Sequence, residues 1–263
     1  MLRWTRNPNE ERGVICGCDE RQEWLLPWWW ERYSFYNSYP VLFCNFGMSK
    51  QAKLWCQKHG EVVSVAFDES FIKSRQDVSS ELASAWSRGN FNWASRSAWL
   101  KKPFAFLESP YKTSIWLDLD CEVLCHLGNL FEYCSNNMPL AMRAEDKITE
   151  GAVPCSTIYN GGVIVFQHGI DILLEQARWT LSSNQDFSAD DVVISFLIEV
   201  TKTPIFSLPK EWNWDSLYGI NFFANIFHWT QQTKEIIKTQ GGIKPSRDEI
   251  LGLTVKPEFL TPF

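Results

Sequence analysis

Short runs of β-branched and aromatic residues alternate along the chain with longer stretches that have helical spacing and capping residues. The runs predict strands at 13–16, 39–46, 61–67, 113–120, 139–145, 160–167, 205–209 and 225–229. The longer stretches predict a helical region up to about residue 38, interrupted at Pro27, and helices at 49–60, 91–109, 170–183, 188–202 and 233–240. The polar stretch 68–90 is predicted to hold no element. Strands alternating with helices indicate an α/β protein.

No repeat, low-complexity tract or long linker interrupts this alternation, so we expect a single domain over residues 1–263. In sheets built from strand–helix–strand units, ligands bind beyond the carboxyl ends of the strands. Candidate chemistry is therefore sought where the predicted strands stop.

The composition is that of a folded protein, because 45% hydrophobic residues can offset the entropy lost on ordering the chain. The net charge of −6 argues against a broad grip on nucleic acid. The chain shows no secretory signal and no run of about 18 apolar residues, so we expect a cytoplasmic protein with no transmembrane segment and with reduced thiols. The run LLPWWW at 25–30 could contact a membrane surface or pack inside. The 14 Trp either fill the core or offer flat platforms to sugar rings or bases.

Two carboxylates, Asp118 and Asp120, follow a buried apolar strand. Residues i and i+2 of an extended segment point to the same side, and two adjacent carboxylates repel each other unless a cation lies between them. Oxygen ligands in this arrangement suit Mg²⁺ or Mn²⁺. The alternative is an ordinary turn or helix cap at a strand end.

Two chemistries use such a pair. In haloacid-dehalogenase phosphatases the first Asp is a nucleophile, and in nucleotide-sugar transferases the pair holds a metal ion on a diphosphate. About 110 residues of predicted strands and helices precede Asp118, whereas the phosphatase motif usually opens its domain. A phosphatase also needs a later Gly-Asp pair, but Asp190 and Asp191 follow Ala189. Position therefore favours the transferase.

Three motifs in order, IWLDLDCEV (115–123), NGGVIVF (160–166) and IFHW (226–229), resemble those of glycosyltransferases of the GT-A fold. The likeness is greatest to glycosyltransferase family 8, which includes glycogenin and bacterial lipooligosaccharide galactosyltransferases, and it covers roughly 13–245. The resemblance implies one Rossmann-like GT-A domain with a mixed central sheet flanked by helices. Its nucleotide-binding half would span about 13–120 and its donor-sugar and acceptor half about 121–263.

The resemblance also implies an activity and a metal. Asp118, Asp120 and His228 would ligate Mn²⁺ (or Mg²⁺) on the diphosphate of a UDP-sugar, and the sugar would pass to an unknown acceptor with retention of configuration. His228 could otherwise be an ordinary core residue. A haloacid-dehalogenase-like phosphatase and a non-catalytic nucleotide-sugar or carbohydrate-binding protein are the alternative functions.

Further site residues follow from the same resemblance. Asn160 would line the donor sugar, and Gly161 and Gly162 would let the backbone approach it. Asp190 and Asp191 correspond to a D-Q-D motif, with Asp190 at the Gln position, and would act in catalysis by holding sugar hydroxyls.

The remaining implied residues surround the nucleotide and the acceptor. A basic residue on the helix before Asp118 would face the diphosphate, with Arg96, Lys101 and Lys102 as candidates. The family ends in H-x-x-G-x-x-K-P-W, and we assign its lysine to Lys244 of GGIKP, 16 residues beyond His228. The base would lie near Asp19, and the acceptor or a sugar ring near Trp212, Asn213, Trp214 and Trp229.

Overall fold

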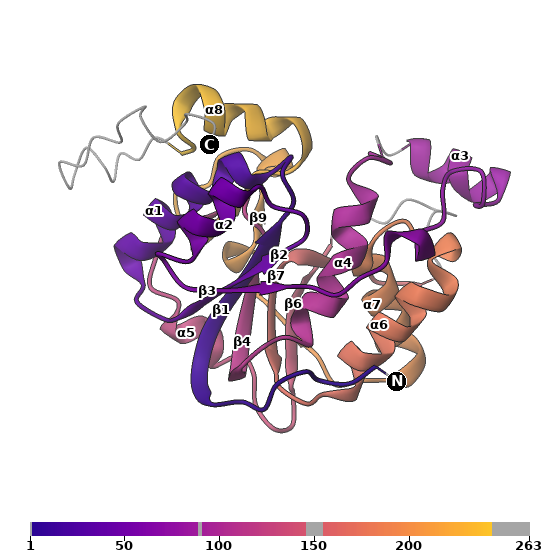
Figure 1. The fold of residues 1–263 in the computed structure, drawn as a ribbon, viewed down its shortest axis with the longest axis horizontal. Coiled ribbons are helices and arrows are strands. Elements are labelled where there is room, and N and C mark those ends of the chain that lie inside the picture. Colours follow the sequence, from indigo (N-terminus) through magenta and orange to yellow (C-terminus); the bar gives the residue numbers. More distant parts are fainter. Residues whose placement is uncertain (1, 89–90, 146–154, 244–263) are drawn as a thin grey trace.

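A mixed sheet of seven strands forms the middle of the part of the chain that the computed structural model describes, residues 2–88, 91–145 and 155–243 (Figure 1). Its strand order is β3-β2-β1-β4-β7-β6-β8. The strands are β1 (Glu10–Cys18), β2 (Val41–Asn45), β3 (Glu61–Ser64), β4 (Tyr111–Leu117), β6 (Leu140–Ala144), β7 (Tyr159–Gln167) and β8 (Phe206–Ser207). β3, β2, β1 and β4 are parallel, whereas β7 is antiparallel to both β4 and β6.

Helices cover both faces of this sheet (Figure 1). They are α1 (Leu26–Tyr36), α2 (Lys50–Cys56), α3 (Ser80–Arg88), α4 (Arg96–Phe106), α5 (Gly128–Phe131), α6 (Asp171–Ser183), α7 (Asp190–Thr201) and α8 (Glu235–Gln240). α1 and α2 pack on one face, and α4, α6 and α7 pack on the other. The predicted mixed sheet flanked by helices is confirmed.

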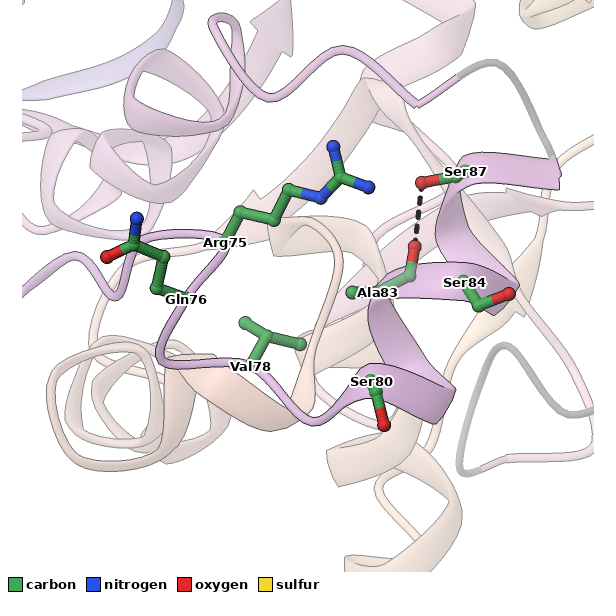
Figure 2. Close-up of a pocket in the computed structure, with 7 residues that line it drawn as sticks. All are labelled: Arg75, Gln76, Val78, Ser80, Ala83, Ser84 and Ser87. Atoms are coloured by element: carbon green, nitrogen blue, oxygen red, sulfur yellow. Dashed lines mark hydrogen bonds between the residues drawn. The ribbon is translucent and has the colours of Figure 1, made fainter.

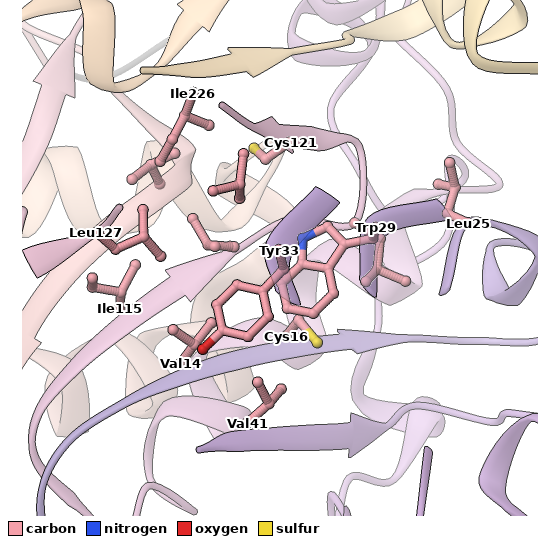
Figure 3. Close-up of a cluster of buried hydrophobic side chains, with 14 of the residues drawn as sticks. Val14, Cys16, Leu25, Trp29, Tyr33, Val41, Ile115, Cys121, Leu127 and Ile226 are labelled. Carbon is pink, nitrogen blue, oxygen red and sulfur yellow. The ribbon is translucent and has the colours of Figure 1, made fainter. Parts of the chain in front are cut away.

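The two hydrophobic cores follow from the alternation of side chains along each strand. In β1, Val14 and Cys16 point into the core beneath α1, where Trp29 and Tyr33 stack with ring centroids 5.1 Å apart (Figure 3). Ile15, between them, points into the opposite core beneath α6 and α7. Because both faces are covered, the central strands are apolar at nearly every position.

The described residues also form a second sheet, of three strands, whose first strand follows β4 in the chain. It contains β5 (Cys121–Val123), β9 (Trp214–Asp215) and β10 (Ile226–His228), in the order β5-β10-β9. β10 pairs antiparallel with β5, so that His228 lies opposite Cys121, and Trp229 N donates to Asp120 O at 2.9 Å. This pairing brings the third predicted motif next to the first.

Local structure departs from the predictions in several places. α3 lies within the segment predicted to be without structure, because Ala83 and Trp86 supply a small apolar face. The short strands β5 and β9 form by pairing with β10, and their sequences have no strand pattern that would have predicted them. α6 and α7 begin after Ile170 and Ala189, which provide no side-chain cap, although favourable caps were expected.

The Trp-rich run at 25–30 is part of the core. Trp28 and Trp29 are buried in α1, and Pro27 lies in the first turn of that helix, where its missing N–H costs nothing. Within the described residues, large exposed apolar side chains gather instead between β9 and β10, at Leu217, Tyr218, Ile220, Phe222 and Phe223. A helix with the length and hydropathy to span a membrane is not found among the described residues.

We predict that Trp29→Ala lowers the free energy of unfolding by about 3–5 kcal/mol, because it empties a fully buried site between α1 and the sheet. Phe35→Ala on the same helix removes a side chain that is 50% exposed and should change stability by about 0.5 kcal/mol or less. Urea denaturation of both variants measures the difference. Equal losses would contradict the assigned core.

Candidate functional site

A cavity of about 880 Å³ opens at the carboxyl ends of β1 and β4. β7 runs antiparallel to β4, so its first residues lie where β4 ends. The lining includes residues of α3 and α4, and also residues from the loops after β1 and β4, the start of β7, the start of α7, the end of β10 and the segment after it: Asp19, Asp118, Asp120, Asn160, Gly161, Gly162, Asp190, Asp191, His228, Thr230 and Lys234. The expected position of the site, where strands stop, matches this cavity.

Lys102 of α4 compensates the negative charge on one side of the cavity. Its Nζ lies 3.0 Å from Asp118 Oδ1 and 3.4 Å from Asp190 Oδ2, and it donates to Gly161 O at 3.1 Å. Asp118 Oδ1 also accepts from Trp116 Nε1 at 2.7 Å. Burial lowers the pKa of Lys102, but the carboxylates of Asp118 and Asp190 outweigh it and leave that pKa raised. Lys102 is therefore a fixed ammonium.

Asp190 and Asp191 begin α7 beside this ammonium. Asp190 is buried and Asp191 is partly exposed. Burial raises the pKa of both carboxyls, while Lys102 opposes the rise. A Cβ at position 161 would lie 3.2 Å from Asp190 Oδ2, so Gly161 allows the β7 backbone to approach this pair closely.

A second cationic centre surrounds Asp120, which lines the same cavity. Lys234 Nζ is 2.6 Å from Asp120 Oδ2, and His228 Nε2 is 3.4 Å from Asp120 Oδ1. Burial acts to raise the pKa of Asp120, but Lys234 and His228 outweigh it and lower that pKa. Burial lowers the pKa of His228, but the neighbouring carboxylates, Asp120 foremost, together outweigh burial and leave that pKa raised. The carboxylate stays ionised because cations surround it.

The described residues contain one group with metal-ligand geometry, formed by Asp120, Cys121 and His228, whose ligand atoms lie within 4.8 Å of one another. Burial raises the pKa of the Cys121 thiol well above its usual value, and Sγ points to Gly162 O at 3.4 Å. The thiol therefore stays protonated, which leaves a carboxylate and an imidazole as donors. These suit Mn²⁺ or Mg²⁺, and Lys234 already places a positive charge against Asp120. Asp118 lines the same cavity but is turned to Lys102.

Behind His228 lies a row of buried polar side chains. His228 Nδ1 is 3.1 Å from Asn213 Oδ1, Asn213 Nδ2 donates to Asn160 Oδ1 at 2.8 Å, and Asn160 Nδ2 donates to Glu145 Oε1 at 2.6 Å. Arg143 forms an ion pair with Glu145. The amide of Asn160, expected to face the donor sugar, is thus engaged within the protein. Asn213 is fully buried behind the cavity wall.

Several predicted residues lie away from the cavity. The guanidinium of Arg96 donates to the backbone carbonyls of Lys73, Asn184 and Phe187, and Lys101 Nζ to that of Phe46. Both side chains therefore fasten loops, and the described residues lining the cavity do not include them. Lys102, the residue after Lys101, is the basic residue of α4 that lines the cavity. Lys244 lies outside the described residues.

The tryptophans at the cavity are not those predicted as platforms. The indole N–H groups of Trp212, Trp214 and Trp229 donate to Tyr133 Oη, Gly219 O and Glu122 Oε2, and the described lining residues include none of the three. The aromatic lining comes instead from Trp24, Phe46, Trp86, Phe91, Trp99 and Trp116. Sequence alone cannot separate a tryptophan that walls a cavity from one in the core, because Trp86 and Trp116 are also almost fully buried.

Asp19 lies at the rim of the cavity, directly after β1. Its carboxylate pairs with Arg21, whose backbone N–H also donates to Asp19 Oδ1 at 3.0 Å. This local turn holds the carboxylate beside Trp24, another lining residue.

Lys234 is the site residue that the sequence prediction missed. It stands six positions after His228, which is the spacing of the lysine in H-x-x-G-x-x-K. Gln231 replaces the glycine and Glu235 replaces the proline of that pattern. Spacing from His228 was the signal that would have found it, whereas the Lys-Pro pair at 244–245 drew the assignment elsewhere.

A second cavity, of about 580 Å³, lies over α3 and is lined by Arg75, Gln76, Val78, Ser80, Ala83, Ser84 and Ser87 (Figure 2). Ser87 Oγ is engaged with Ala83 O at 2.7 Å. None of the predicted site residues belongs to it, and its lining carries no carboxylate or imidazole.

Protein-family models give no match to this chain, and neither do curated protein sequences. Solved structures do match. The galactosyltransferase LgtC, in complex with donor and acceptor sugar analogs, superposes with a TM-score of 0.57 at 14% identity, covering 94% of this chain and 98% of LgtC. Mouse xyloside xylosyltransferase 1 gives a TM-score of 0.51 at 11% identity, covering 85% of this chain and 98% of that one.

The glycosyltransferase GlyE of Streptococcus pneumoniae TIGR4 gives a TM-score of 0.52 at 16% identity over 85% of this chain, which spans 55% of GlyE. At these identities the likenesses establish the fold. The chain has the GT-A fold of glycosyltransferases, and the resemblance to the family 8 type expected from its motifs is confirmed at that level.

In the metal-free protein, His228 should make stability depend on pH. Its pKa is raised in the folded state, so its contribution is complete below the unfolded value of about 6.5 and is lost as pH rises through the folded value. We predict that the free energy of unfolding falls over this window in the wild type, measured by urea denaturation with chelator, and falls less in His228→Gln. Parallel curves for the two proteins would contradict the pairing with Asp120.

Proposed function

We propose that the protein is a metal-dependent glycosyltransferase that moves a sugar from a nucleotide sugar, a UDP-sugar, to an acceptor. The observation that carries the proposal is the meeting of Asp118, Asp120 and His228 in one cavity at the carboxyl edge of a GT-A sheet. His228 comes from a strand more than 100 residues later in the chain, so this grouping is a product of the fold. The structures with the same fold include named glycosyltransferases.

Asp118, Asp120 and His228 would hold Mn²⁺ or Mg²⁺. The ion would neutralise the negative charge that develops on the leaving diphosphate. The residues present fit such an ion, because Asp120 and His228 lie 3.4 Å apart and a lysine ammonium already contacts Asp120. Asp118, which lines the same cavity, would be the third ligand.

Two ammonium groups would bind the diphosphate. Lys234 reaches into the cavity beside Asp120, and Lys102 does so beside Asp118. In this proposal Lys234 takes the role first assigned to Lys244. The aromatic walls formed by Trp24, Trp86 and Trp99, with Asp19 at the rim, would receive the base.

The donor sugar would lie against the start of α7. Asp190 and Asp191 both line the cavity there, and Lys102 Nζ lies 3.4 Å from Asp190 Oδ2. These carboxylates would hold sugar hydroxyls by charge-assisted hydrogen bonds. We propose retention of configuration from the likeness to the family 8 type, and we assign no covalent nucleophile.

The test is release of UDP from a panel of UDP-sugars with Mn²⁺. We predict that chelator abolishes release and that Asp118→Asn and Asp120→Asn each lower it by about 100-fold or more, because each removes a ligand that acts on the leaving group. Asp171→Asn, an exposed acid at the start of α6, is the matched control and should retain full activity.

Each alternative has its own signature in this assay. A phosphatase that uses Asp118 as nucleophile would hydrolyse an aryl phosphate with Mg²⁺ and ignore UDP-sugars. A non-catalytic binder would be stabilised by a sugar or nucleotide sugar in a thermal shift and never release UDP. Full activity of Asp120→Asn in excess chelator would refute the metal assignment.

Lys234→Met should weaken the binding of UDP by about 10- to 100-fold, because it removes one charge-assisted contact to the diphosphate. Lys112→Met is the control, since Lys112 pairs with Glu11 on the surface at the other end of β4. Isothermal titration calorimetry with UDP and Mn²⁺ compares the three proteins. Wild-type affinity in Lys234→Met would exclude this lysine from the diphosphate site.

A further inference from the structure

The chain that follows β10 forms a loop whose two ends meet at one buried carboxylate. Residues 230–242 leave β10 after Trp229, carry Lys234 and α8, and return beside α1 (Figure 1). Trp229 Nε1, before the loop, and the backbone N of Ile243, after it, each donate to Glu122 Oε2 at 2.9 Å. Loop 230–242 is therefore closed at its base by one oxygen atom of β5.

Arg32 of α1 completes the closure. Its Nε lies 3.4 Å from Glu122 Oε1, and its Nη2 donates to Gly241 O at 2.9 Å. Trp28 Nε1 donates to the same carbonyl at 3.0 Å. Arg32 and Glu122 are both buried, so removing either one would leave the other charge uncompensated. We call Glu122 and Arg32, together with the chain that they hold at 241–243, the loop anchor.

Gly242 allows the returning chain to come this close. Its φ is +98°, in the region that favours glycine. A Cβ at this position would lie 2.5 Å from Glu122 Oε2. Ile243, the next residue, is buried. A side chain at position 242 would therefore push the end of the loop away from the anchor.

Lys234 lies in the middle of this loop. Its Nζ is 2.6 Å from Asp120 Oδ2, on the turn just before β5. The first part of the loop has its own contact, since Thr230 N donates to Ser216 Oγ at 3.0 Å. The part after Lys234 is held by the anchor and by Ile237, which is buried. A lysine side chain is long and flexible, so its ammonium stays in one place only if its backbone is fixed.

We infer that Glu122 and Arg32 are positioning residues for Lys234. By closing loop 230–242 they hold the Lys234 ammonium beside Asp120 before a ligand binds. A cation held in this way binds an anion more tightly, because little conformational freedom remains to be lost on binding. The inference rests on the proposed function for the ligand, a nucleoside diphosphate, whereas the closure of the loop belongs to the protein alone.

Gly242→Ala tests the anchor without removing a buried charge. Its methyl group would meet Glu122 Oε2, so we expect the Ile243 amide to exchange its hydrogen at least about 10-fold faster than in the wild type. Gly169→Ala is the matched control, because Gly169 also has a positive φ, +87°, but a Cβ there meets nothing within 4 Å. Hydrogen exchange followed by NMR of the ligand-free proteins compares them. Unchanged exchange at Ile243 in Gly242→Ala would overturn the anchor.

Calorimetry with UDP and Mn²⁺ tests the positioning role. We expect Gly242→Ala to weaken UDP binding by about 10-fold, and to have no further effect in protein that already carries Lys234→Met, because both changes remove the same contact. Gly169→Ala should bind UDP as the wild type does. A general structural defect would instead add to the loss of the lysine. Equal effects of Gly242→Ala with and without Lys234→Met would therefore overturn the positioning role.

A failure of the proposed function would look different. Wild-type UDP affinity in Lys234→Met would refute the role proposed for this lysine at the diphosphate, and the positioning role at that ligand with it. No binding of UDP by the wild type would refute the nucleotide-sugar donor itself. Faster exchange at Ile243 in Gly242→Ala would support the anchor in either case, because that measurement uses no ligand.

Discussion

Negative charge buried at the carboxyl edge of the sheet has to be compensated, and much of the site is arranged around that requirement. Asp118 and Asp190 share Lys102, and Asp120 is held between Lys234 and His228. A buried carboxylate without such partners would be strongly destabilising, so the cations are part of the fold as much as of the site. The same positive charges are the ones that a diphosphate would meet.

The backbone makes this concentration of charge possible. A Cβ at position 162 would collide with the His228 ring, and one at position 161 would lie 3.2 Å from Asp190 Oδ2, so the glycines let β7 pass close to both centres. The pairing of β10 with β5 then holds the imidazole against the turn that carries Asp120. The geometry of the candidate metal site thus depends on two short strands, of which β10 was predicted from the sequence and β5 was not.

The sequence predicted the long elements well, because β1, β4 and β7 are apolar runs and the helices α4, α6 and α7 are long stretches between such runs. It predicted poorly wherever a role depends on a partner far along the chain. Arg96, Lys101 and Lys102 are equivalent as residues on one helix, and only packing shows that two fasten loop carbonyls while the third enters the cavity. The sequence could not show which tryptophans line the cavity for the same reason, because tertiary contacts decide whether a tryptophan lies in the core or in the cavity wall.

The chain by itself determined the α/β class, the acidic pair after an apolar strand and the spacing that joins His228 to Lys234, because these are local patterns. The tertiary structure decided which cation faces which carboxylate, that Asn160 and Asn213 bond to each other, and which aromatic rings wall the cavity. Most of those facts depend on contacts between segments far apart in the sequence, such as Lys102 with Gly161, Asn213 with Asn160 and Lys234 with Asp120. A buried polar atom finds its partner only once the backbone has brought the two within about 3 Å.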